Sequence, residues 1–215
     1  MTGAVGRWEM DELRLIVGAM VILSGATALL VVMPYLLLKD QQPPPGLKPY
    51  TAEQLVGRQV YIASGCIYCH TQQPRDIAQA PDALRGWGRA PVAADYAYDT
   101  PHLLGTMRTG PDLLNIGARQ PSKDWHLGHL YQPRAYTPGS IMPAYPFLFE
   151  VRRGAAVPGD TVVALPPAFA RPGEVVVAKP EALALVAYLL SLDRTYPALA
   201  PLPVPAAAAA KKAGP

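Results

Sequence analysis

Residues 63–73 read ASGCIYCHTQQ and contain the only two cysteines of the 215-residue chain, Cys66 and Cys69, with His70 directly behind them. Four chemistries place two cysteines at this spacing: a disulfide, a redox dithiol, half of a zinc site, and covalent haem attachment. Each of them needs different partners elsewhere in the chain, so the surrounding sequence decides between them.

The motif favours haem over the other three chemistries. A redox dithiol belongs to a strand-then-helix unit, and no such unit precedes Cys66. His126 and His129 could complete a zinc site, but their spacing is shorter than usual and His70 would have no role. In a haem site the two thiols form thioethers and His70 coordinates the iron. The sequence therefore predicts one covalently attached haem c, with zinc as the main alternative.

The N-terminal region predicts a membrane anchor. Residues 15–38 form a run of 24 residues without a charge, which at about 1.5 Å per residue exceeds the ~30 Å apolar thickness of a bilayer. A cleaved signal peptide would have a shorter apolar region and a small-residue cleavage site, which residues 39–46, KDQQPPPG, do not provide. Because haem c is attached outside the energy-conserving membrane, we expect a single-pass protein of the bacterial inner membrane, with a periplasmic haem domain and a cytoplasmic N-terminus.

The composition changes after the anchor, because nearly all of the 25 prolines lie beyond residue 42. Thr51 and Gln54 form a possible capping box that opens one helix, and residues 180–192 predict another. Between them the pattern is mostly loop, with short β-like runs at 161–165 and 174–178. The predicted units are an N-terminal segment with the anchor (1–40, span about 15–38), a Pro-rich linker (41–50), a haem domain (51–196, insert at about 152–178) and a disordered Ala/Pro-rich tail (197–215).

The haem domain resembles the class I cytochrome c fold. In that family a glycine and an aromatic residue on the first helix pack across a leucine and a tyrosine on the last helix. The resemblance implies a mainly α protein, with one N-terminal transmembrane helix followed by a class I cytochrome c-like domain with long Pro/Gly-rich loops. The four matching residues are Gly57, Tyr61, Leu185 and Tyr188.

Residues 110–113, GPDL, resemble the family loop whose proline carbonyl accepts the proton of the haem histidine. Pro111 is therefore the predicted partner of His70. Outside the membrane end, Met107 and Met142 compete for the second axial position. Met142 is favoured, because flanking prolines can hold a loop methionine against a haem face, although a methionine can also fill a gap in a core. Histidine and methionine ligation suits electron transfer, since neither position is open to a substrate.

A closer resemblance covers about residues 50–150. It is to the mono-haem, membrane-anchored cytochrome c subunit (subunit II) of cbb3-type cytochrome c oxidases. It implies a subunit that is not catalytic on its own and relays electrons from a donor cytochrome to the haem-copper catalytic subunit, beside the other subunits of the oxidase. Met107 stands where the family usually has lysine, and residues 152–178 do not resemble the usual C-terminal region. The matching segments are GRQVYIASGCIYCHTQ (57–72), RTGPDLLNIGAR (108–119) and DWHLGHLYQPRAYTPGSIMPAYP (124–146).

Further candidates surround the motifs. Arginines could neutralise the haem propionates, since buried carboxylates need paired charges, or could be ordinary solvated side chains. The DWHLGHL segment could face the haem edge or the catalytic subunit, or could be a helix with satisfied histidines. The arginines are Arg108, Arg119 and Arg134, and the DWHLGHL candidates are Trp125, His126 and His129.

Two other functions stay open at this point. A related nitric oxide reductase also uses an anchored mono-haem cytochrome subunit, and a haem-based sensor would need an open axial position. Nucleic acid is not an expected partner, because the formal charge is only +3 and no basic run occurs apart from two terminal lysines.

Overall fold

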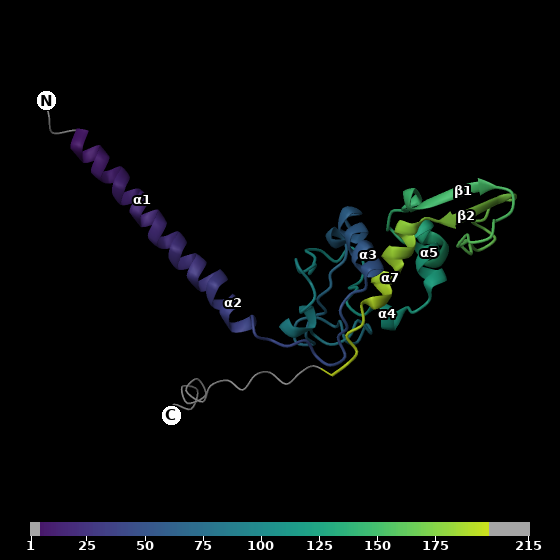
Figure 1. Ribbon diagram of the computed structural model, residues 1–215, viewed down its shortest axis with the longest axis horizontal. Coiled ribbons are helices and arrows are strands. Elements are labelled where there is room, and N and C mark those ends of the chain that lie inside the picture. Colours follow the sequence, from purple (N-terminus) through teal and green to yellow (C-terminus); the bar gives the residue numbers. More distant parts are fainter. Residues whose placement is uncertain (1–4, 198–215) are drawn as a thin grey trace. The chain divides into compact units, whose positions relative to one another are not determined.

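The computed structural model describes residues 5–197, and residues 1–4 and 198–215 lie outside the described part. The predicted disordered tail therefore lies almost wholly outside it. By contacts the chain divides after Gln42 into two units, and each is described here by itself (Figure 1).

The first unit is one long apolar helix. From Asp11 to Leu38 it has 28 residues and no buried side chains, and its mean hydropathy reaches 2.6 over an 18-residue stretch, so its length and composition suit a membrane span. This confirms the predicted N-terminal apolar helix. Its three consecutive parts are α1 (Val5–Thr27), the π-helical turn η1 (Ala28–Val32) and α2 (Met33–Leu38).

The π-helical turn lies directly before the only proline of the anchor. Met33 donates its backbone N–H to the Ala28 carbonyl five residues back. Pro34 has no N–H, so it cannot donate to the carbonyl four residues before it, and a wider turn accommodates this interruption.

The second unit is built on two helices, α3 (Ala52–Ala63) and α7 (Pro180–Ser191). The capping box predicted from Thr51 and Gln54 opens α3: the Gln54 N–H donates to Thr51 Oγ1 at 3.3 Å, and the Thr51 N–H donates to Gln54 Oε1 at 2.9 Å. In α7, Pro180 occupies the first turn, where its missing N–H would have no partner in any case.

The two helices cross with no room for a side chain at Gly57. A Cβ built there would lie 1.8 Å from the backbone oxygen of Ala184. Beside the crossing, the buried rings of Tyr61 and Tyr188 meet edge to face, with centroids 5.5 Å apart. Figure 1 shows the two helices side by side in the middle of this unit. The structure thus contains the helix crossing that the class I cytochrome c resemblance implied.

Short elements and long loops surround this pair, which confirms the mainly α fold class. A two-stranded antiparallel sheet encloses the predicted insert, with Phe149 opposite Ala178 and Arg153 opposite Glu174; its first strand begins before the insert. The elements are η2 (Cys66–Tyr68), η3 (Ala93–Tyr96), α4 (Ile116–Arg119), α5 (Lys123–Tyr131), α6 (Pro133–Tyr136), η4 (Pro146–Leu148), β1 (Phe149–Arg153) and β2 (Glu174–Ala178).

One buried and one half-buried ion pair fix the long loop between η2 and α4. Arg58 Nε lies 3.3 Å from Asp99 Oδ1, and Arg89 Nη1 lies 2.8 Å from Asp95 Oδ2. Arg194, just beyond α7, donates from Nε to the Asp95 carbonyl at 3.1 Å. Removing one partner of a buried pair leaves an uncompensated charge and typically costs about 3–5 kcal/mol. These contacts therefore hold a loop that has little regular secondary structure.

Candidate haem site

The cysteine motif occupies a tight turn at the end of α3. Gly65 adopts a left-handed conformation with φ of 72°, which lets the chain leave the helix. The N–H groups of Cys69 and His70 both donate to the Cys66 carbonyl, at 3.2 and 3.0 Å. Both thiols are free, with Cys66 buried and Cys69 exposed. The turn therefore keeps the two thiols and the imidazole together.

His70 is oriented by the GPDL loop. Its Nδ1 lies 2.7 Å from the Pro111 carbonyl, which can only accept, so Nδ1 carries the proton and Nε2 keeps its lone pair. Burial lowers the pKa of His70 below its ordinary value and so favours the neutral ring, the form that binds a metal. A Cβ at Gly110 would lie 2.3 Å from His70 Cε1, so glycine allows the loop to lie against the ring. These residues fit a haem c, which needs two free thiols and one oriented neutral imidazole.

Met142 and Met107 differ in their surroundings. Met142 is half-buried and packs against the core beside Tyr145, whereas Met107 is 59% exposed. The Tyr145 N–H donates to the Leu130 carbonyl at 2.9 Å, which fastens the Met142 loop to α5. Burial, together with the neighbouring Cys66 thiol, raises the pKa of Tyr145 to about 12. The Met142 loop therefore lies next to the cysteine motif, and the assignment of Met142 as axial ligand stays a prediction.

The predicted arginines have three different environments. Arg108 uses its guanidinium within the protein: it donates to Asp82 Oδ2 at 2.6 Å and to Thr71 Oγ1 at 3.0 Å. Arg134 is exposed on α6. Arg119 is half-buried and lies close enough to His70 for its charge to lower the histidine pKa. No carboxylate of the described residues forms an ion pair with Arg119, so its charge is the one best placed for a buried anion.

The α5 histidines do not join the cysteines. The ring of Trp125 stacks on His129 with centroids 4.5 Å apart, and His126 is buried with Nε2 2.8 Å from the Gln120 carbonyl. Among residues 5–197 no three Cys, His, Asp or Glu side chains are grouped as metal ligands. This geometry disfavours the zinc alternative. The interface role predicted for the three DWHLGHL residues stays a prediction.

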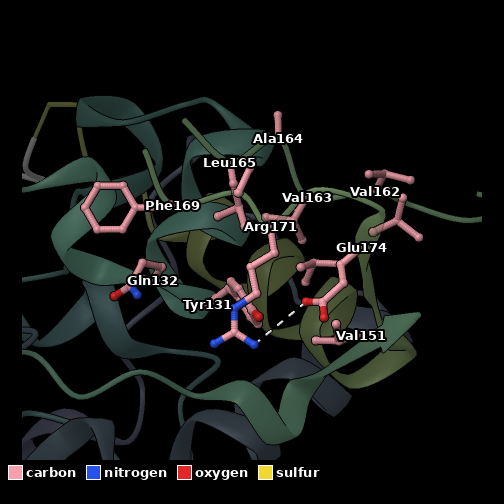
Figure 2. Close-up of a pocket in the computed structure, with 13 residues that line it drawn as sticks. Tyr131, Gln132, Val151, Val162, Val163, Ala164, Leu165, Phe169, Arg171 and Glu174 are labelled. Atoms are coloured by element: carbon pink, nitrogen blue, oxygen red, sulfur yellow. Dashed lines mark ion pairs between the residues drawn. The ribbon is translucent and has the colours of Figure 1, made fainter. Parts of the chain in front are cut away.

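A pocket of about 550 Å³ lies away from the cysteine motif, in the insert. Figure 2 shows its walls, where Tyr131 and Gln132 from the end of α5 face the apolar side chains of the insert. Arg171 and Glu174 form an ion pair of 3.9 Å within its lining. None of the predicted haem residues lines this pocket.

Sequence reasoning did not single out two residues that shape the His70 environment, Gly110 and Asp112. Both lie in the GPDL loop, which was noticed for Pro111 alone. Gly110 is needed because the imidazole occupies the space of a side chain. Asp112 bonds the segment after His70 to this loop. The one signal in the sequence that points to Gly110 and Asp112 is that they flank Pro111.

Comparison with protein families identifies the chain. Residues 6–165 match the model of the family described as cytochrome C oxidase, mono-heme subunit/FixO. The matched range includes the anchor, the cysteine motif, the GPDL loop and the Met142 loop. A comparison with curated proteins finds no match. The match agrees with the resemblance to the cbb3-type oxidase subunit, and the chain therefore belongs to the family of mono-haem cytochrome c oxidase subunits, the one-haem electron-transfer subunits of that enzyme.

Proposed function

We propose that this chain is the electron relay of a cbb3-type oxidase, with one haem c bound through thioethers from Cys66 and Cys69 and axial ligands from His70 and Met142. The observation that carries the proposal is the His70 ring, whose Nδ1 is bonded to Pro111 at 2.7 Å and whose Nε2 is left for a metal. When bound, the haem iron supplies a one-electron redox couple.

Residues of this chain would orient the iron ligand, exclude water from the haem and pair with its propionates. Pro111 fixes the tautomer and orientation of His70, as second-shell groups commonly do for metal-binding histidines. Met142, held in its loop against the core, would supply the second iron ligand and so leave no position open to water or substrates. Of the three candidate arginines, Arg119 would offer a partly buried positive charge to a propionate, whereas Arg108 is already bonded to Asp82. A buried anion of this kind needs a paired charge.

We further propose that the haem domain faces the periplasm and the N-terminus faces the cytoplasm. Electrons would enter from a donor cytochrome and leave toward the haem-copper catalytic subunit, with no reaction catalysed by this chain itself. The family match to an oxidase subunit and the single apolar helix from Asp11 to Leu38 support this arrangement.

Replacing both cysteines is expected to remove the covalent haem. The wild-type protein should stay in the membrane fraction and give one haem-stained band after denaturing electrophoresis. Cys66→Ser combined with Cys69→Ser should give none, because no thioether can form. A colourless wild-type band, or zinc recovered in equal amount with the protein, would overturn the haem assignment.

Extraction in mild detergent is expected to co-purify a large multi-span subunit with haem b and copper. Stopped-flow oxidation of the reduced complex by oxygen should then oxidise haem c on the timescale of turnover. A complex that reduces nitric oxide but not oxygen would favour the nitric oxide reductase subunit instead. Isolation of the chain alone, with a ferrous haem that readily binds carbon monoxide, would contradict the relay and support a sensor.

A further inference from the structure

One buried carboxylate links the two segments that hold His70. The Asp112 side chain is 1% exposed. Its Oδ2 accepts from Thr71 Oγ1 at 2.6 Å and from the Gln73 N–H at 2.7 Å, and its Oδ1 accepts from the Leu114 N–H at 2.9 Å. The carboxylate therefore bonds the segment that follows His70 to the loop that contains Pro111.

Backbone hydrogen bonds run beside this link. The Gly110 N–H donates to the Cys69 carbonyl at 2.9 Å, and the Leu113 N–H donates to the Thr71 carbonyl at 2.8 Å. The Pro111 carbonyl, which accepts from His70, belongs to the peptide group that joins Pro111 to Asp112. The hydrogen bonds of the Asp112 side chain therefore anchor the residue directly after the acceptor of the His70 hydrogen bond.

The charge of Asp112 is only partly compensated. Arg108 Nη2 lies 3.8 Å from Asp112 Oδ2, but Arg108 Nη1 lies only 2.6 Å from Asp82 Oδ2, so two buried carboxylates share one guanidinium. Arg119 donates to the main-chain carbonyl of Asp112 at 2.7 Å and not to its carboxylate. Negative charge therefore remains near Thr71, next to His70.

The same charge acts on the histidine. Burial lowers the pKa of His70, whereas the Pro111 carbonyl and the Asp112 carboxylate act in the opposite direction. Burial also raises the pKa of Asp112, and the donors from Thr71, Leu114 and Gln73 oppose that rise. Every one of these hydrogen bonds is donated to the carboxylate, which is the pattern that an ionised acid accepts.

We infer that Asp112 is a positioning residue for His70, which holds the Pro111 carbonyl against Nδ1 and keeps a negative charge beside the ring. Both effects make the imidazole a stronger electron donor and stabilise the oxidised iron. This inference rests on the proposed function, because it requires haem iron on His70. Asp112 therefore lowers the reduction potential of the haem in this inference.

The test uses the full chain in its complex, with Asp112→Asn compared with wild type. We expect the reduction equilibrium of haem c to shift about tenfold toward the ferrous form, which is about 59 mV for a one-electron couple. The ¹⁵N signal of the His70 ring should also move, because the hydrogen bond at Nδ1 weakens. Retention of one covalent haem and of the methionine–iron absorption would show that the site itself is intact.

Asp82→Asn is the matched control, because Asp82 is also buried and contacts the same arginine. Its carboxylate accepts from the Arg75 N–H and from Arg108, and not from Thr71 or Gln73, so we expect a much smaller shift. Thr71→Val removes the hydrogen bond that Thr71 donates to Asp112, together with the one that it accepts from Arg108, but keeps the Asp112 charge. It should shift the potential in the same direction by less.

Equal shifts of the reduction potential in the Asp112 and Asp82 variants would show that any nearby buried negative charge has this effect, and would overturn the inference. An unchanged potential in Asp112→Asn with its haem retained would also overturn it, while leaving the relay intact. If that variant does not accumulate, Thr71→Val carries the test, and the absence of any shift there would overturn the inference. A wild-type chain without covalent haem would instead contradict the proposed function.

Discussion

Replacing Gly57 with alanine is expected to destabilise the haem domain by more than about 3 kcal/mol, beyond the usual cost of overpacking. The added Cβ would lie 1.8 Å from the Ala184 oxygen and 2.9 Å from the Leu185 nitrogen. Both are backbone atoms, so no side-chain rotation can relieve the overlap, and α3 and α7 must move apart. Since whole domains are stable by only about 5–15 kcal/mol, this loss is a large fraction of the total.

Chemical denaturation followed by haem absorbance would measure this loss of stability. Val56→Ala is the matched control, because Val56 precedes Gly57 in the same helix but is largely exposed. That change should stay within about 0.5 kcal/mol of wild type. A Gly57→Ala protein that unfolds within about 1 kcal/mol of wild type would contradict the close crossing of α3 and α7.

Replacing Met142 with alanine is expected to abolish the weak far-red absorption of sulfur bound to ferric iron and to lower the reduction potential. The thioether favours the ferrous state, so its loss stabilises the oxidised form. Met142 is half-buried beside the core, and its loop is fastened to α5 by the Tyr145–Leu130 hydrogen bond. Optical spectra of the oxidised protein and a redox titration would measure both effects.

Met107→Ala provides the control for this experiment. Its side chain is 59% exposed, so its loss should leave the absorption and the potential nearly unchanged. The reverse pattern, with both properties lost in Met107→Ala and kept in Met142→Ala, would move the axial ligand to Met107. The Met142 loop would then be better explained as an interface.

Local patterns in the sequence predicted the parts of the fold that depend on neighbouring residues. The Thr51 and Gln54 capping box and the start of α7 at Pro180 are both present. The β-like run at 174–178 forms β2, whereas the run at 161–165 contributes only a bridge from Val162 to Val177. The partner strand β1 was not expected, because its sequence, FEVRR, is short and has three charged residues among five.

Contacts between distant residues were harder to predict. Arg108 was a candidate for a haem propionate, but the structure bonds it to Asp82, 26 residues earlier in the chain. Pro111 was placed correctly beside His70 only because the GPDL segment resembles a known loop. A sequence pattern shows which side chains are charged, but the partner of a buried charge depends on the folded path of loops that have no periodicity.

The position of α7 near the end of the chain sets an order of events in biogenesis. Cys66 is only 8% exposed in the folded domain, and burial raises the pKa of its thiol to about 11, so the folded state offers little reactive thiolate. The helix that closes this core begins at Pro180, far downstream of His70. The motif is therefore synthesised well before α7, which supplies much of the same core. Under the proposed function, thioether formation at Cys66 and Cys69 would use this interval, before α7 completes the core.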